Sequence, residues 1–211
     1  MSFLDTTIQD FSDKLASRAS VPGGGGASAL VGAAGVALGA MVGELTVGKK
    51  KYAAVEADIK ALMVKANEVR AELLHQIDED ARVFEPLSKA YGLPKDTEEQ
   101  RQEKAVIMEN CLKEACSVPM AIMEKCCEAI LLQKDFAAKG SSLAISDAGV
   151  GVAFCRAALE GAALNVFINT KSMTDTAYAE GLNKKANEML AVYVPMADEI
   201  YKSVFDRLVK K

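Results

Sequence analysis

Residues 21–47 read VPGGGGASALVGAAGVALGAMVGELTV, and this stretch decides the fold class. Pro22 and four glycines break the chain, and the segment after them is nearly uncharged and rich in alanine and glycine. Gly35, Gly39 and Gly43 recur every four residues, so on a helix they form one stripe where a neighbouring backbone can approach closely. Because each glycine weakens a helix by roughly 1 kcal/mol relative to alanine, tight packing must offset them. The stretch therefore predicts a small-residue helix buried in an all-α core.

The helix expected at residues 27–47 is also about as long as a membrane span. It is built from glycine, alanine and valine rather than leucine and phenylalanine, it carries Glu44, and we identify no second stretch like it. The first residues show neither the basic nor the apolar region of a secretory signal. A buried core helix is therefore favoured over a transmembrane one.

Helical periodicity continues on both sides of this stretch, and no segment shows the sustained alternation of a strand. Leu62, Ala66, Val69, Leu73 and Ile77 advance by threes and fours, which is typical of the seam of a helical bundle. Proline, glycine and serine breaks separate the remaining helices. The sequence predicts one domain over residues 1–211, a bundle of about six helices at residues 3–15, 27–47, 53–91, 96–138, 146–169 and 174–208.

Composition excludes several classes of protein and of site. The net charge of −4 gives no broad reason to bind nucleic acid or an anionic membrane. The five cysteines include no paired C-x-x-C motifs, so we expect free thiols in a reducing cytoplasm. Glu72 and His75 match the Glu-x-x-His of di-iron bundles, but such sites need the motif twice and the chain has one histidine. We therefore expect no metal site.

The seam of the long helix raises the question of a buried carboxylate. After Ile77 the next inward step falls on Asp80 or Ala81, and Phe84 follows one turn later. If Asp80 faces the core, its carboxylate must find a partner or shift its pKa, as catalytic acids and bases do. If Ala81 faces the core, Asp80 lies in water, and the spacing alone favours neither.

Amide side chains share a stripe with small residues in the helix expected at residues 146–169. Ala157, Gly161, Asn165 and Asn169 follow one another at steps of four, and Asp147 lies near the start of the same helix. Asparagine is a poor interior helix residue. The pattern indicates either hydrogen bonds between helices or contacts with a ligand.

Two further features have both a structural and a functional interpretation. The glycine run could present free backbone N–H groups to an anion, or it could be a hinge or close-approach turn. No strand precedes it and no Lys-Ser or Lys-Thr pair follows at P-loop spacing, so neither standard nucleotide motif is present. Lys49, Lys50 and Lys51 either end a helix in solvent or receive the carboxylates of a ligand.

A series of short motifs, taken in order along nearly the whole chain, resembles the cyclodeaminase/cyclohydrolase family. This family comprises the cyclodeaminase domain of formiminotransferase-cyclodeaminase and the stand-alone methenyltetrahydrofolate cyclohydrolases. The motifs are Ser20-Val21-Pro22-Gly23-Gly24-Gly25-Gly26, Met41-Val42, Leu45-Thr46-x-Gly48-Lys49-Lys50-x-Tyr52, Asp78-x-Asp80-Ala81-x-x-Phe84, Leu93-Pro94-Lys95, Val118-Pro119, Ser146-Asp147 and Asn165-Val166-x-Ile168-Asn169.

The resemblance implies an all-α fold, a homodimer and a tetrahydrofolate derivative as the substrate, with no prosthetic group. It also implies site residues. Asp80, Asp147 and Asn165 are the implied catalytic residues, and Pro22, Gly23, Gly24, Gly25, Lys49, Lys50, Asp78 and Asn169 are the implied substrate-binding residues. The chain departs from the family pattern at Gly26, where many members have serine, and at Ser141, where many have asparagine.

The resemblance implies one of two reactions at the same carbon. A cyclohydrolase adds water to 5,10-methenyltetrahydrofolate and gives 10-formyltetrahydrofolate. A cyclodeaminase closes the same bridge from 5-formiminotetrahydrofolate and releases ammonia. Either reaction needs a group that transfers a proton, and Asp147 or Asp80 is the candidate for this role. Whichever aspartate does not transfer the proton is expected to pair with the pterin. The fourth glycine and the lack of a transferase domain favour the cyclohydrolase, and a non-catalytic helical binding or dimerisation module is a third hypothesis.

Overall fold

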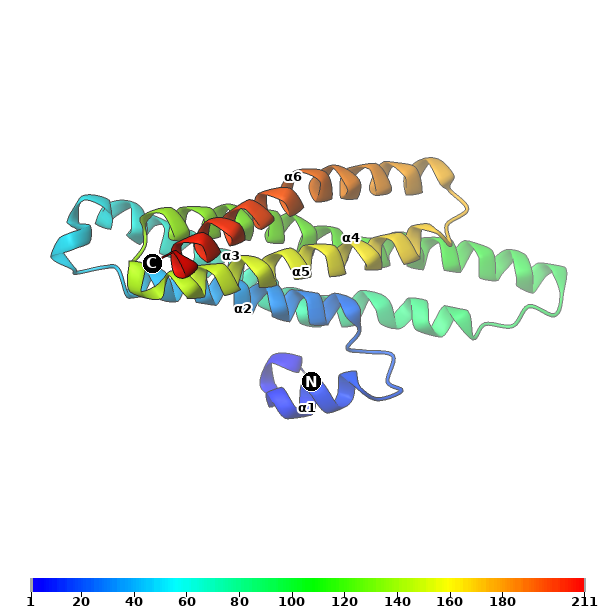
Figure 1. Ribbon diagram of the computed structural model, residues 1–211. Helices are drawn as coiled ribbons and strands as arrows, with labels where there is room; N and C mark the ends of the chain where they lie inside the picture. Colours follow the sequence, from blue (N-terminus) through cyan, green and yellow to red (C-terminus); the bar gives the residue numbers. More distant parts are fainter. Residues whose placement is uncertain (1, 211) are drawn as a thin grey trace.

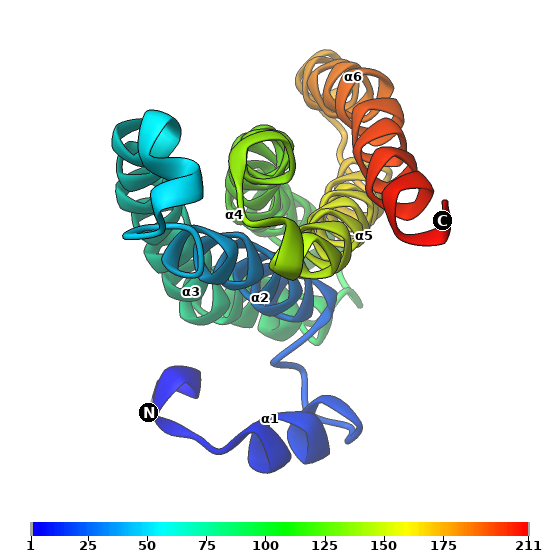
Figure 2. The same cartoon turned by 60° about the vertical axis from the view of Figure 1, so that its left-hand side comes forward.

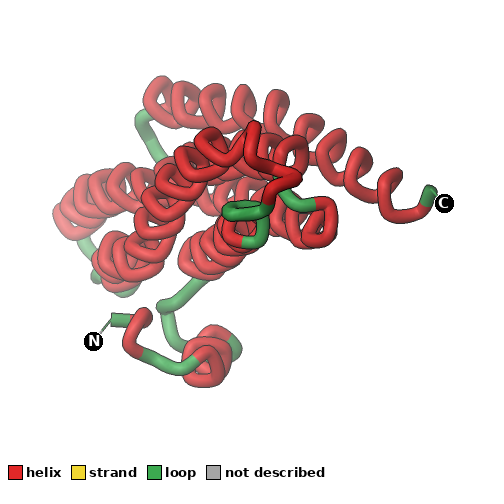
Figure 3. Tube along the Cα trace, turned by 90° about the vertical axis from the view of Figure 1, so that its left-hand side faces the viewer, coloured by secondary structure: helices red, strands yellow, loops and turns green. Residues whose placement is uncertain are grey.

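The computed structural model describes residues 2–210, and among these residues six α-helices and three 3-10 helices make up the regular structure, with no strand. The single-domain all-α prediction is confirmed (Figures 1 and 3). The elements in chain order are η1 (Phe3–Asp5), α1 (Ile8–Leu15), α2 (Gly24–Glu44), η2 (Lys50–Val55), α3 (Glu56–Tyr91), α4 (Glu98–Lys139), η3 (Ser142–Ala144), α5 (Ile145–Thr170) and α6 (Thr176–Val209).

The small-residue helix α2 lies at the centre of the packing, against α3, α4 and α5 (Figure 2). The glycine stripe serves the close approach that its spacing predicts. A Cβ atom added at Gly35 would lie 2.8 Å from the carbonyl oxygen of Gly151 on α5, and one at Gly43 would lie 2.6 Å from the Met63 side chain on α3. The buried Gln133 of α4 also donates a hydrogen bond of 2.6 Å from Nε2 to the Gly35 carbonyl. Glycine is therefore required where the helices meet.

Helix α2 begins three residues earlier than its sequence predicts. Gly23 is the N-cap, with φ −123° and ψ −159°, and the following three glycines form the first turn. The first turn is fixed by tertiary contacts, because Gly26 donates its backbone N–H to Asp80 on α3. The glycine run is therefore a helix N-terminus held against its neighbours rather than a hinge.

The N-terminal helix departs most from expectation. Residues 3–15 divide into η1 and α1, and α1 lies apart from the bundle in Figures 1 and 2. Phe11 is the only buried residue of α1, and its ring packs edge-to-face against Phe3. Ile8 is 87% exposed, so this apolar side chain of α1 lies in solvent and not against the bundle. A helix of two turns offers too few repeats for the period to identify its buried side.

The expectation that no second stretch resembles a membrane span is corrected. The helical segment of residues 142–170 is also long and apolar enough to cross a membrane. Within its apolar stretch of 18 residues 44% is buried, compared with 56% for the corresponding stretch of α2. These two helices pack against each other side by side in the bundle. Core helices of this kind satisfy the same length and hydropathy test.

The five cysteines are free, and all but one are buried. Cys126 and Cys155 have no exposed surface, and burial raises the pKa of the Cys155 thiol to about 12. Cys111 is the partly exposed exception. The sulfur atoms thus serve mainly as small apolar core groups.

Candidate active site

A small cavity lies where the start of α2 meets the middle of α3 and α4 and the last turns of α5. Its volume is about 110 Å³. It brings together five of the residues predicted from the sequence, namely Gly23, Gly24, Asp80, Asn165 and Asn169. Its other lining residues are Ser20, Val21, Phe84, Ala115, Pro119 and Ile168.

Asp80 faces the core, which settles the question left open by periodicity. Its side chain is 9% exposed, on the same seam as the buried Ile77. The Oδ2 atom accepts a hydrogen bond of 2.8 Å from the backbone N–H of Gly26. Burial raises the pKa of the Asp80 carboxyl, and the Gly26 N–H opposes this in part. A carboxyl group of this kind can exchange a proton nearer neutral pH than an exposed aspartate can.

The space around each glycine near Asp80 decides whether a side chain could fit at that position. A Cβ atom added at Gly25 would lie 2.1 Å from Asp80 Oδ1, so no side chain fits there. At Gly23 nothing lies within 4 Å of such an atom. At Gly26 the nearest atom, the Ile77 carbonyl oxygen, is 3.6 Å away, which is ordinary contact. The structure therefore explains how serine can replace Gly26, whereas Gly25 must remain glycine.

The two asparagines make different hydrogen bonds, one of them between helices as the sequence allowed. Asn169 donates a hydrogen bond of 3.3 Å from Nδ2 to the Ala115 carbonyl on α4, so it links two helices. Asn165 donates one of 2.8 Å to the Gly161 carbonyl one turn earlier on α5. Both also line the cavity. These bonds orient the amides while leaving their Oδ1 atoms available to accept from a ligand.

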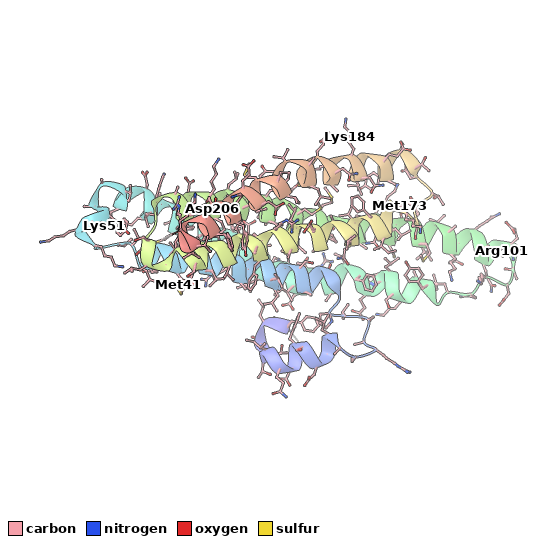
Figure 4. All side chains as sticks on the ribbon, viewed as in Figure 1. Met41, Lys51, Arg101, Met173, Lys184 and Asp206 are labelled. Carbon is pink, nitrogen blue, oxygen red and sulfur yellow. The ribbon has the colours of Figure 1, made fainter. Side chains whose placement is uncertain are left out.

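Lys49, Lys50 and Asp147 lie at the other end of the bundle. Lys49 Nζ is 3.4 Å from Ser141 Oγ, just before the start of α5, and Asp147 lies in the first turn of that helix. Asp147 and Asn165 share one side of α5 but are 18 residues apart, which is about 27 Å at 1.5 Å per residue. Figure 4 shows the labelled Lys51 at this end, opposite Arg101. One chain does not bring these predicted residues to the cavity.

Hydrogen bonds fix the structure at the end of the bundle where Lys49 lies. Tyr52 Oη accepts a hydrogen bond of 2.9 Å from the backbone N–H of Ser142 and lies 3.3 Å from its Oγ. These bonds lower the pKa of Tyr52 to about 8. The buried Thr46 accepts a bond of 2.7 Å from the backbone N–H of Ser141. The contacts tie the segment after α2 to the start of α5.

Asp78 does not line the cavity and instead binds the N-terminal segment. Its carboxylate accepts a hydrogen bond from the Ser2 hydroxyl and one of 2.7 Å from the backbone N–H of Phe3. It thereby anchors the N-terminal segment to α3. Pro22, also predicted to bind substrate, is buried, follows a cis peptide bond and packs next to Gly26.

The lining residues missed from the sequence are mostly apolar. Phe84 was the most accessible to prediction, because it follows Asp80 by one turn on the same seam. Pro119 lies inside α4, where a proline leaves a backbone carbonyl without its helical partner. Ser20, Val21, Ala115 and Ile168 have no distinguishing pattern. Their place in the cavity depends on how the helices pack.

Residues 2–210 hold neither a metal-ligand cluster nor a second site suited to acid/base chemistry. No three His, Cys, Asp or Glu side chains gather there in a way that could hold a metal ion. A larger cavity, of about 680 Å³, lies between α5 and α6. Apolar side chains and a single acidic residue, Glu160, dominate its lining. It offers no pair of groups for acid/base chemistry.

Comparison with known proteins identifies relatives along most of the chain. The formiminotransferase-cyclodeaminase family model matches residues 7–188. A methenyltetrahydrofolate cyclohydrolase of Methylorubrum extorquens is 44% identical over 94% of this chain and 95% of its own length. The formimidoyltransferase-cyclodeaminase of Mus musculus is 31% identical, and the matched part spans 35% of that longer protein.

A solved structure extends the match to three dimensions. The crystal structure of formiminotetrahydrofolate cyclodeaminase from Thermotoga maritima superposes with a TM-score of 0.85 over 98% of this chain and 99% of the other, at 28% identity. The ordered motifs and these matches agree. The chain belongs to the formiminotransferase-cyclodeaminase family.

Proposed function

We propose that this chain is a methenyltetrahydrofolate cyclohydrolase, which hydrolyses 5,10-methenyltetrahydrofolate to 10-formyltetrahydrofolate. The observation that carries this proposal is the buried Asp80 carboxyl with its raised pKa, in a cavity that Asn165 and Asn169 also line. The 44% identity to a cyclohydrolase over nearly the full length of both chains supports the same assignment.

Asp80 is suited to move the proton that the reaction requires. As water adds to the methenyl carbon, a C–O bond forms and the ionised Asp80 accepts a proton from that water. The tetrahedral intermediate then collapses, the bond from that carbon to N5 breaks, and a proton is delivered to N5 while the formyl group stays on N10. The second proton of the water is released. A carboxylate beside the cationic bridge also stabilises the bound substrate.

The asparagines are suited to position the reacting groups. Asn165 and Asn169 keep their amide orientation through bonds to Gly161 and Ala115. Their Oδ1 atoms can then accept from the attacking water or from a pterin N–H. The reaction needs no prosthetic group or metal ion, and we propose none.

Cyclodeaminase activity is the second candidate, and the solved relative from Thermotoga maritima favours it. There N10 attacks the formimino carbon and ammonia leaves, so the same carboxyl would protonate the departing nitrogen. A non-catalytic binding module is the third candidate. It predicts that no folate is turned over and that Asp80→Asn changes nothing.

We further propose that the protein works as a homodimer in the cytoplasm, without a nucleic-acid or membrane partner. The free, buried thiols fit a reducing compartment. The net charge of −4 offers no attraction to phosphate backbones or anionic lipids.

The deciding experiment follows the absorbance of the methenyl chromophore with purified protein. Loss of absorbance from 5,10-methenyltetrahydrofolate, faster than in buffer and abolished in Asp80→Asn, is the expected result. Appearance of absorbance from 5-formiminotetrahydrofolate with release of ammonia would assign the cyclodeaminase instead. Absence of both would overturn the proposal.

A further inference from the structure

Helix α4 contains a buried proline at the wall of the cavity. Pro119 is one of three prolines inside helices among residues 2–210, with Pro86 in α3 and Pro195 in α6. Pro86 and Pro195 are exposed, whereas Pro119 is buried and lines the cavity that holds Asp80. A proline inside a helix offers no N–H to the carbonyl four residues earlier, and it destabilises the helix. A contact that compensates for this loss is therefore expected near Pro119.

The carbonyl that Pro119 leaves without a helical partner belongs to Ala115. Its oxygen accepts a hydrogen bond of 3.3 Å from Nδ2 of Asn169 on α5. In an uninterrupted helix the N–H of residue 119 would bond to this oxygen, and a proline ring also crowds it. Ala115, Pro119 and Asn169 all line the same cavity. A side-chain donor from α5 thus replaces the backbone donor that α4 lacks.

The Ala115 carbonyl fixes which end of the Asn169 amide is free to bind a ligand. A carbonyl oxygen only accepts hydrogen bonds, so it can bond to the NH₂ end of the amide and not to Oδ1. The last turn of α5 is also held from α6, because Thr170 Oγ1 donates a hydrogen bond of 2.7 Å to Asn183 Oδ1. Since Asn169 is only 7% exposed, few other orientations are open to it. Its Oδ1 atom therefore remains an acceptor.

The neighbouring polar side chains of the cavity also offer acceptors. Asn165 donates from Nδ2 to the Gly161 carbonyl at 2.8 Å, which leaves its Oδ1 atom free. The Asp80 carboxyl group adds two oxygen atoms, one of which accepts from the Gly26 N–H. Such a set of acceptors suits a ligand that presents N–H groups. The donor edge of a pterin, an amide N–H beside an amino group, has this pattern.

We infer that Pro119 is a positioning residue, which leaves the Ala115 carbonyl to Asn169 and thereby holds the Asn169 amide with Oδ1 as an acceptor for the pterin. The identity of this ligand rests on the proposed function above. Pro119 acts through Asn169 and takes no part in proton transfer. A substitution that restores a regular helix should therefore lower turnover without destabilising the protein.

Two variants separate the effect on the backbone from the contact made by the proline ring. Pro119→Ala and Pro119→Val both restore an N–H that can bond to the Ala115 carbonyl, and valine also keeps about the bulk of the ring. Both should lower kcat/KM for 5,10-methenyltetrahydrofolate about 10–10²-fold, as expected when a positioned group loses its orientation. Wild-type turnover in Pro119→Val would show that the ring contact matters instead, and would overturn the inference.

Thermal unfolding distinguishes positioning from a structural role. Pro119→Ala should unfold at or above the wild-type temperature, because alanine is a far better helix residue than proline. A loss of turnover that comes with a lower thermal midpoint would make Pro119 a structural residue only, and would overturn the inference. Circular dichroism provides the measurement for each variant.

A double-mutant cycle tests whether Pro119 acts through Asn169. Asn169→Ala should lower kcat/KM at least as much as Pro119→Ala does, and the double variant should be no worse than Asn169→Ala. Losses that multiply in the double variant would overturn the inference. Pro195→Ala is the matched control, because it restores an N–H in α6, away from the Asp80 cavity. Its kcat/KM should equal that of the wild type, and an equal loss there would also overturn the inference.

Nuclear magnetic resonance gives a readout that does not depend on turnover. In protein labelled with ¹⁵N-asparagine, the side-chain NH₂ signal of Asn169 is assigned by its absence from Asn169→Ala. This signal should shift in Pro119→Ala and stay in place in Pro195→Ala. An unshifted signal in Pro119→Ala would overturn the inference even if turnover falls. A wild type that turns over no folate would count against the proposed function, and the shift of this signal would still decide whether Pro119 orients Asn169.

Discussion

The carboxylate of Asp80 and the backbone N–H of Gly26 lie 2.8 Å apart, although they are 54 residues apart in the sequence. This hydrogen bond joins the first turn of α2 to the middle of α3. It also places a buried carboxyl group at the wall of the cavity.

Asp80→Asn should lower turnover of 5,10-methenyltetrahydrofolate roughly 10²–10⁴-fold, the usual contribution of a general acid or base. The amide keeps an oxygen that can accept from Gly26, so the fold should persist. Steady-state kinetics on the wild type and on Asp80→Asn provide the measurement, with circular dichroism as the check on folding. Turnover within a few-fold of the wild type would exclude Asp80 as the proton shuttle.

The same substitution should change how stability depends on pH. The pKa of Asp80 is raised in the folded state, so its protonated form contributes stability that is fully present below the pKa of an unfolded aspartate. This contribution is lost as the pH rises through the higher folded pKa. Thermal midpoints measured from pH 4 to pH 8 should therefore fall for the wild type relative to Asp80→Asn. Parallel curves would contradict the raised pKa.

Gly25→Ala should abolish activity and destabilise the protein, because the added carbon would lie 2.1 Å from Asp80 Oδ1. Gly23→Ala is the matched control, because nothing lies within 4 Å of a Cβ atom added at Gly23. We expect Gly23→Ala to unfold within a few degrees of the wild type and Gly25→Ala to unfold well below it. Equal thermal midpoints for the two would refute the steric account.

Long helices were predictable from sequence because their period repeats many times. The glycine stripe of α2 and the seam of α3 both lie where the spacing places them. The orientation of Asp80 was not predictable, because it depends on the Gly26 N–H of another helix. The role of Asp78 was also hidden, since its partners lie 75 and 76 residues away.

The implied site residues show a different limit. The spacing of Asp147 and Asn165 along one helix already requires a separation of about 27 Å. Resemblance to a family names both residues without saying whether one chain can bring them together. The course of α5 shows that one chain keeps the two residues near opposite ends of the same helix.

Thr46→Val should destabilise the protein by about 1–3 kcal/mol, the usual cost of a buried group left without its hydrogen bond. The hydroxyl of Thr46 accepts from the Ser141 N–H, and both residues are 1% exposed. Thr46→Ser keeps the hydroxyl and should lose much less. Denaturant unfolding of the two variants gives the comparison, and equal losses would show that the methyl group matters more than the bond.

Asp78→Ala should release the N-terminal segment from α3. Trypsin should then cleave faster after Lys14 and Arg18, which are both exposed in the wild type. Glu85→Ala is the control, because Glu85 is an exposed residue of the same helix whose ion pair is with Lys89. Time courses of proteolysis followed by mass spectrometry provide the measurement. Unchanged cleavage would mean that Phe3 and Phe11 hold the segment without Asp78.

The buried cysteines make it possible to time the separation of the helices by thiol labelling. Cys116 and Cys126 on α4 and Cys155 on α5 are at most 1% exposed, so a thiol reagent reaches them only when the helices around them separate. A pulse of reagent followed by peptide mapping would time the exposure of each sulfur atom. Simultaneous labelling would show that α4 and α5 part in one cooperative step, and staggered labelling would reveal which helix leaves the core first.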